Sequence, residues 1–122
     1  MSDNNNFLPT FNCLKEILSP FVNELILVTD AVDNFYLNTH FIMKNKKPMY
    51  FGSVKTNKNY VSFHLMPVYV FPDLLKNISP ELKRRMQGKS CFNFSKIDIA
   101  LFKELNQLTI NGFAEYKKAG YL

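Results

Sequence analysis

The sequence contains no tryptophan, only two cysteines and four glycines, and no long apolar run. Its uninterrupted apolar stretches fall short of the ~20 residues that a bilayer-spanning helix needs, which excludes that class of membrane protein. Cys13 and Cys91 allow at most one disulfide, so a disulfide-stapled secreted scaffold is also excluded. The start, Met-Ser-Asp-Asn-Asn-Asn, has neither the basic nor the apolar segment of a secretory signal. We therefore expect a cytoplasmic protein whose thiols stay reduced.

The chain has 122 residues, of which 47% are hydrophobic and 20% are charged. This composition opposes disorder, and this length suits one domain with one core. We expect a single domain over residues 1–122, with residues 1–6 forming a polar, flexible arm. Phenylalanine and tyrosine make up 15% of the chain. Together with a net charge of +5, this composition is typical of proteins that bind single-stranded nucleic acid, but core phenylalanines produce it too.

The positive charge is concentrated in the middle of the chain. Residues 1–43 have one lysine and five acids, residues 44–89 have ten cations and two acids, and residues 90–122 have four cations and three acids. An anionic partner would therefore bind residues 44–89 if their cations converge in space.

The N-terminal half predicts a helix followed by strands. Apolar residues spaced three and four apart predict a helix over residues 8–19, which Ser19-Pro20 ends. Residues 25–28 are a short apolar run that fits either a buried strand or another helical turn. Residues 35–43 predict a strand, and residues 49–54 and 60–66 predict a β-hairpin around the polar loop 56–59. In its second strand Val61, Phe63 and Leu65 share the core face, and Tyr60, Ser62, His64 and Met66 share the other.

The C-terminal half predicts two helices and a strand. Residues 67–72, bounded by prolines, predict an extended segment. Ser79-Pro80 predicts a helix start and Gly88 its end, and residues 91–94 predict a strand. Ser95-Lys96-Ile97-Asp98 resembles a capping box, so the last helix is expected to begin there, with a kink or break at Asn111-Gly112.

Basic residues in and after the predicted helix are the candidate anion site. Arginine forks match phosphate oxygens, so Lys83, Arg84, Arg85 and Lys89 could bind phosphate or nucleic acid. The alternative is a solvated helix face. Stacking with bases would also need exposed aromatics, whereas Tyr50, Tyr60 and Tyr69 lie in apolar runs that favour packing. Gly88-Lys89-Ser90 matches the end of a P-loop but lacks its first glycine and its strand-to-helix order, which excludes that motif.

Histidines and a cysteine on predicted strands form a second candidate site. His40, His64 and Cys91 could bind zinc or iron, or Cys91 could act as a catalytic pair with His64 or His40. Their spacing matches no ligand or nucleophile motif, so structural histidines are the alternative. We group Tyr60, His64 and Cys91 as a candidate pocket.

Acidic residues in the N-terminal third are the candidate metal site. Glu24, Asp30 and Asp33, with Glu16 nearby, offer hard oxygen ligands to iron or another cation. Without tight spacing, such acids also fit a solvated surface.

Residues Tyr60–Tyr69, Ile78–Phe94 and Leu101–Leu105 resemble the YdhG-like family of small cytosolic bacterial domains. The resemblance covers roughly residues 35 to 120. It implies an α+β fold, in which N-terminal and C-terminal helices pack a twisted antiparallel sheet in a frataxin-like two-layer arrangement. Some members are described as frataxin-like iron chaperones, so the resemblance also implies iron as a possible ligand.

Together, the resemblance and the absence of a catalytic motif predict a non-enzymatic binding module, which is an iron chaperone or a domain that binds a small ligand or a protein partner. The alternatives are an anion or nucleic-acid binder that uses residues 83–89, and an enzyme that depends on a cysteine and a histidine.

Overall fold

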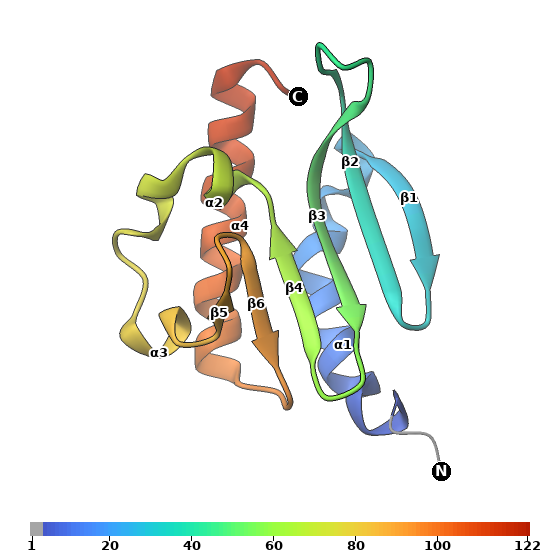
Figure 1. Cartoon of the computed structure of the whole chain (residues 1–122), viewed down its shortest axis with the longest axis vertical. Coiled ribbons are helices and arrows are strands. Elements are labelled where there is room, and N and C mark those ends of the chain that lie inside the picture. Colours follow the sequence, from blue (N-terminus) through green and yellow to red (C-terminus); the bar gives the residue numbers. More distant parts are fainter. Residues whose placement is uncertain (1–3) are drawn as a thin grey trace.

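A computed structural model describes residues 4–122 and shows an α+β domain (Figure 1). The helices comprise four α-helices and two short 3₁₀ helices: α1 (Asn4–Leu18), η1 (Ser19–Glu24), α2 (Pro67–Val70), η2 (Pro72–Leu75), α3 (Pro80–Lys83) and α4 (Ile99–Ala119). The strands form one sheet: β1 (Ile26–Ala31), β2 (Asn34–Ile42), β3 (Pro48–Thr56), β4 (Val61–Leu65), β5 (Met86–Gln87) and β6 (Cys91–Phe94). Within residues 4–122, no helix is both long and apolar enough to cross a bilayer.

The sheet has the order β1-β2-β3-β4-β6-β5, and all neighbouring strands are antiparallel. This confirms the predicted antiparallel sheet with N- and C-terminal helices. The predicted hairpin is confirmed as β3 and β4, and the ambiguous run 25–28 contributes to strand β1.

Both long helices lie behind the sheet in Figure 1, so they cover one of its two faces. Helix α1 packs against β3 and β4, and rings of α4 contact rings of the strands, such as Phe102 with Phe94 at 4.9 Å between ring centroids. Alternate strand residues, including Phe35, Phe63 and Phe92, are fully or almost fully buried beneath the helices. Each such side chain contributes about 1.5–3 kcal/mol through burial. The opposite face has no helical layer, and we call it the open face.

An irregularity in β3 keeps two polar residues on the open face. Leu37 of β2 pairs with Gly52, but Asn38 pairs with Tyr50, so β3 contains one extra residue at this point. Such a bulge reverses the alternation of side chains. Tyr50 and Ser53 therefore both face away from the helices. Gly52 lies so close to β4 that a Cβ atom there would be 2.8 Å from the backbone oxygen of His64.

Residues 67–72 are not extended, so that prediction was wrong. Pro67 and Pro72 each lie in the first turn of a short helix, where the fixed φ of proline fits and its missing N–H costs nothing. Phe71 between them is outside both helices, with φ −124° and ψ 78°.

The prediction of one helix ending at Gly88 was also wrong. Helix α3 has only four residues, and Met86 and Gln87 instead pair with β6 as strand β5. Gly88 has φ +79° and turns the chain between these two strands. Residues 86–87 thus form backbone hydrogen bonds with β6 where the sequence predicted a last helical turn.

Two predictions for the last helix were wrong. Asp98, not Ser95, is the N-cap, because its side chain accepts a 3.1 Å hydrogen bond from the N–H of Leu101. The helix also continues through Gly112, where a Cβ atom would lie 2.8 Å from Cβ of Pro67. Close packing of α4 against α2, not a break, explains this glycine.

The first helix begins earlier than predicted. Residues 4–6, predicted as part of a flexible arm, belong to α1, whereas residues 1–3 lie outside the described residues.

Candidate functional site

The open face is rich in side chains that form hydrogen bonds or carry aromatic rings. The strands position them by alternation, because their neighbours in sequence are buried against the helices. None of the strand residues that form this set carries a carboxylate. The residues are Asn34, Tyr36, Asn38 and His40 of β2, Tyr50, Ser53 and Lys55 of β3, Ser62 and His64 of β4, Gln87 of β5, and Cys91 and Asn93 of β6.

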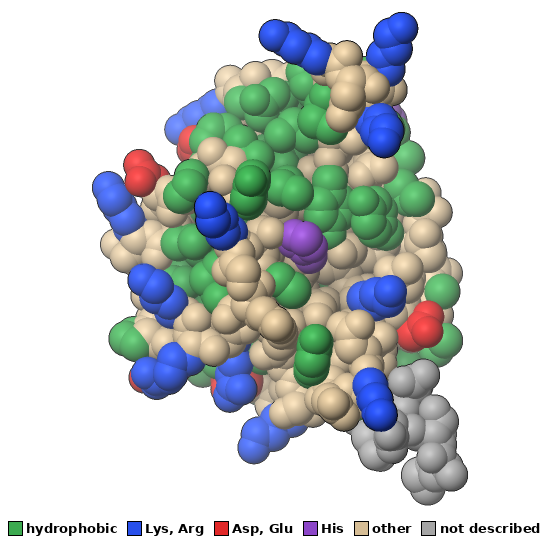
Figure 2. Space-filling model, viewed as in Figure 1, with side chains coloured by type: hydrophobic (Ala, Val, Ile, Leu, Met, Phe, Trp, Pro, Cys, Tyr) green, Lys and Arg blue, Asp and Glu red, His purple; other side chains and the backbone are tan. Residues whose placement is uncertain are grey.

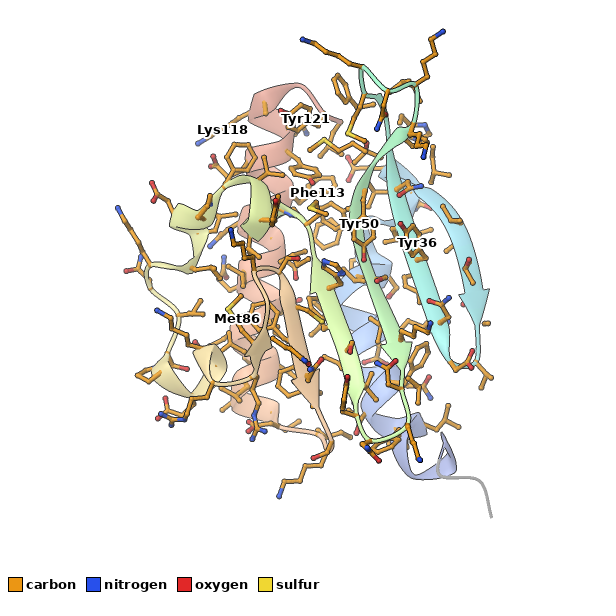
Figure 3. The ribbon with its side chains drawn as sticks, viewed as in Figure 1. Tyr36, Tyr50, Met86, Phe113, Lys118 and Tyr121 are labelled. Atoms are coloured by element: carbon orange, nitrogen blue, oxygen red, sulfur yellow. The ribbon has the colours of Figure 1, made fainter. Side chains whose placement is uncertain are left out.

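Three rings form what we call the aromatic row: Tyr36, Tyr50 and His64. The rings of Tyr36 and Tyr50 are stacked, with centroids 4.8 Å apart and planes inclined by 21°. His64 meets Tyr50 edge-on at 5.1 Å. Figure 3 shows Tyr36 and Tyr50 beside each other on β2 and β3. Contact between the rings fixes their orientation before any ligand binds.

Burial keeps two rings of the aromatic row, those of Tyr50 and His64, uncharged. It raises the pKa of Tyr50, whose hydroxyl forms a hydrogen bond with Ser53, so this phenol stays neutral at physiological pH. Burial also lowers the pKa of His64, which is therefore an uncharged imidazole at neutral pH. Tyr50 and His64 thus offer two uncharged rings among strand residues that carry no carboxylate.

His64 is held by Ser90, which the sequence analysis considered only as the end of a P-loop-like motif. Its Nε2 atom is hydrogen-bonded to Oγ of Ser90 at 2.5 Å, and Ser90 is buried. Ser90 precedes β6, and its carbonyl accepts a hydrogen bond from the N–H of Leu65. The turn between β5 and β6 therefore fixes the imidazole.

Four polar residues form a second line across the open face, which we call the amide row: Asn57, Ser62, Asn93 and Gln87. Asn57 Nδ2 donates to Ser62 Oγ at 2.9 Å, and Ser62 Oγ donates to Asn93 Oδ1 at 2.8 Å. Asn93 Nδ2 then donates to Gln87 Oε1 at 2.6 Å. Amides and hydroxyls of this kind recognise base edges in single-stranded nucleic acids.

Basic side chains lie around the margin of the open face. Figure 2 shows a histidine near the middle of this view, with lysines and arginines around the edge and few acids. Lys89 adjoins Ser90 in sequence, and its Nζ lies 6.0 Å from the ring centroid of Tyr69, which is 55% exposed. Lys55 lies on β3 itself.

The structure divides the predicted cation cluster. Arg84 Nη2 lies 3.6 Å from Oε2 of Glu81, and Arg85 lines a small recess with Lys96 and Asp98. Lys83 is exposed at the end of α3, and Lys89 is separated from these three by β5. Lys89 is therefore the member next to the aromatic row.

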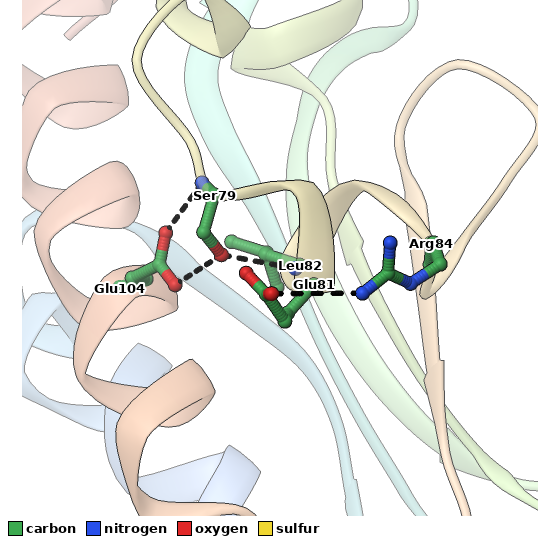
Figure 4. Close-up of polar contacts among 5 residues, drawn as sticks. All are labelled: Ser79, Glu81, Leu82, Arg84 and Glu104. Carbon is green, nitrogen blue, oxygen red and sulfur yellow. Dashed lines mark hydrogen bonds and ion pairs between the residues drawn. The ribbon is translucent and has the colours of Figure 1, made fainter.

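Helix α3 and its cations are anchored to α4 by Glu104 (Figure 4). The N–H of Ser79 donates to Glu104 Oε1 at 2.9 Å, and the Ser79 hydroxyl donates to Oε2 at 2.6 Å. The same hydroxyl accepts from the N–H of Leu82 at 3.1 Å, which caps α3 as predicted. Sequence reasoning missed Glu104 because a partner 25 residues away gives no local signal.

The candidate pocket is only partly assembled. His64 and Cys91 are direct cross-strand neighbours, whereas Tyr60 lies just before β4, four residues from His64. His40 lies on β2, two strands from His64. Burial raises the pKa of the Cys91 thiol, which opposes a thiolate nucleophile. A cavity of about 480 Å³ lies elsewhere, between η2 and α4.

The predicted acidic metal site does not form. Asp30 binds Lys15 at 2.7 Å, while Glu24 ends η1 and Asp33 lies in the β1–β2 turn. Across residues 4–122, the structure brings no three His, Cys, Asp or Glu side chains together in a group that could hold a metal ion. The strands and helices separate residues that are close in sequence.

Comparisons of the chain with protein-family models, with curated proteins and with solved structures found no match. Membership of the YdhG-like family, and iron as the ligand, stay predictions.

Proposed function

We propose that the protein is a non-enzymatic binding module whose open face binds single-stranded nucleic acid. The observation that carries the proposal is the aromatic row, Tyr36, Tyr50 and His64, on a sheet face whose polar and aromatic strand residues include no acid. Base stacking on aromatic side chains is worth about 1–3 kcal/mol per base and tolerates any sequence.

The charge distribution supports a polyanionic ligand. Lys55 is exposed on β3 of the open face, Lys89 is exposed next to Ser90, the partner of His64, and Asp30 is held near α1 by Lys15. Exposed cations attract phosphates, and the attraction weakens as salt rises. The rings and cations together favour a strand whose bases are unpaired.

The proposal is tested by fluorescence anisotropy with labelled single-stranded DNA and RNA and the matching duplexes. Single strands should bind more tightly than duplexes, because paired bases cannot stack on the rings. Tyr36→Ala should weaken binding by about 1–3 kcal/mol, roughly 5- to 150-fold, whereas Tyr36→Phe keeps the ring and the affinity. Equal affinity of the alanine and phenylalanine variants would contradict stacking.

The contribution of the cations is measured in a salt series from about 50 to 200 mM. Each phosphate contact in a single strand adds about 0.7 to the slope of log K against log salt, so Lys89→Ala should reduce that slope by about this amount. Lys103→Ala, an exposed lysine on α4 behind the sheet, is the matched control and should leave the slope unchanged.

Iron binding, which the family resemblance implied, is tested separately by isothermal titration with ferrous and ferric iron. Binding at sub-millimolar concentration, with no affinity for oligonucleotides, would favour the iron-chaperone alternative over this proposal.

A further inference from the structure

The hydrogen bonds of the amide row all run in one direction. The Nδ2 of Asn57 can only donate and the Oδ1 of Asn93 can only accept, so the Ser62 hydroxyl between them must accept from the first and donate to the second. Asn93 then donates its own amide hydrogen to Gln87. Chains of this kind polarise each bond in the same sense.

This direction decides what the end of the row presents to a ligand. One lone pair of Gln87 Oε1 accepts a hydrogen bond from Asn93 Nδ2 at 2.6 Å. Within residues 4–122, no protein group accepts a hydrogen bond from Gln87 Nε2, and the residue is exposed on edge strand β5. The row therefore ends in free N–H donors at the margin of the open face.

Gln87 is also within reach of a base stacked on the aromatic row. Cys91 pairs with His64 on one side and with Gln87 on the other. Two strand spacings of ~4.8 Å place Gln87 about 10 Å from His64 at the backbone. A pyrimidine ring over His64 can point its edge across Cys91 toward the Gln87 amide.

We infer that Gln87 selects bases with a carbonyl acceptor at their outer edge, favouring thymine or uracil over cytosine. Thymine offers the acceptor O4 where cytosine carries the N4 amino donor. The donor end of the amide row can bind O4 but faces another donor in cytosine. This inference rests on the proposed function, since it concerns a ligand of the same open face.

The test compares oligo-dT with oligo-dC of equal length at neutral pH and fixed salt. Both are pyrimidines, and they differ in the group at position 4, in the neighbouring N3, which donates in thymine and accepts in cytosine, and in the 5-methyl group of thymine. One hydrogen bond of ordinary strength corresponds to roughly 3- to 10-fold, and we expect oligo-dT to bind more tightly by this factor. Gln87→Ala should bring the two affinities together.

Gln87→Glu gives a sharper result, because its carboxylate still accepts from Asn93 but has no hydrogen to donate. It should weaken binding of both strands and shift the ratio toward oligo-dC. Gln107→Ala is the matched control, since Gln107 lies on α4 and its amide binds Asn111 at 2.9 Å. It should leave the wild-type preference intact.

The outcomes separate the inference from the proposed function. If the wild type binds both strands equally, or if the preference survives in Gln87→Ala, the role of Gln87 is refuted while binding by the open face stands. If neither strand binds, the proposed function fails and the inference fails with it.

Discussion

Replacing Gly52 by alanine tests how closely β3 approaches β4. The added Cβ would lie 2.8 Å from the backbone oxygen of His64 and 3.4 Å from a methyl carbon of Leu18. Since Gly52 does not have a positive φ, the alanine backbone itself is unstrained and the cost is steric. A backbone oxygen cannot rotate away as a side chain can, so β3 and β4 must separate.

The expected loss follows from two opposing contributions. Overpacking costs about 1–3 kcal/mol, and the reduced entropy of the unfolded chain returns about 0.4–1 kcal/mol. Gly52→Ala should therefore lower the free energy of unfolding by about 1–2 kcal/mol. In urea unfolding followed by circular dichroism, the midpoint should fall by roughly 0.5–1 M.

Two controls make this result interpretable. Gly88→Ala adds a Cβ where no atom lies within 4 Å, so its loss reports only the strain of φ +79°. Near-ultraviolet circular dichroism reports on the stacked rings of Tyr50 and Tyr36, so this signal should change if Gly52→Ala displaces the bulge in β3. A stability equal to or above wild type in Gly52→Ala would refute the close approach of the two strands.

Three other predictions concern buried polar groups. Glu104→Ala should lower the free energy of unfolding by about 2–3 kcal/mol, because Ser79 loses its two hydrogen bonds to the Glu104 carboxylate. Glu81→Ala removes only an exposed ion pair and should change the free energy of unfolding by less than about 0.5 kcal/mol. Equal urea midpoints for the two variants would contradict this prediction. Burial raises the pKa of Tyr50 and Tyr116, so in an absorbance titration two of the six tyrosines should resist ionisation until the protein unfolds. Stability should fall above about pH 10, because the unfolded chain then loses protons that the folded chain keeps. Ionisation of all six tyrosines before unfolding would refute this prediction. Burial lowers the pKa of His64, so near pH 6.5 the unfolded chain binds a proton that the folded chain resists, and stability should fall between about pH 7 and pH 5. His64→Gln should flatten this slope, and an unchanged slope in that variant would refute the prediction.

The fold was largely predictable from the spacing of apolar residues. Apolar residues at every second position indicate the buried face of a strand, and those at every third or fourth position indicate the buried face of a helix. The alternation Val61, Phe63, Leu65 predicted the core face of β4 correctly, and the same pattern identified Ser62 and His64 as its other face. Errors occurred where one residue type serves two conformations. Prolines 67 and 72 start helices as readily as they mark extended chain, and Gly112 allows close helix packing as readily as a break.

The site was less predictable because it depends on strand order and on a bulge. Tyr36 gave a signal, since it alternates with the buried Phe35 and Leu37, but only pairing with β3 places it on Tyr50. Ser90 and Asn93 acquire their partners across β4 and β6, at sequence separations of 26 and 31 residues. Arg85 and Lys89 are close in sequence but lie apart in the structure, because strand β5 lies between them.

The central claim is that the open face, and not the helical face, binds single-stranded nucleic acid. It is tested most directly by titrating oligo-dT into isotopically labelled protein and mapping the backbone amide shifts by NMR. We expect shifts concentrated at Tyr36, Ser53, His64 and Asn93, with α1 and the exposed side of α4 unchanged. Shifts confined to α1 and α4, or none at saturating oligonucleotide, would contradict it.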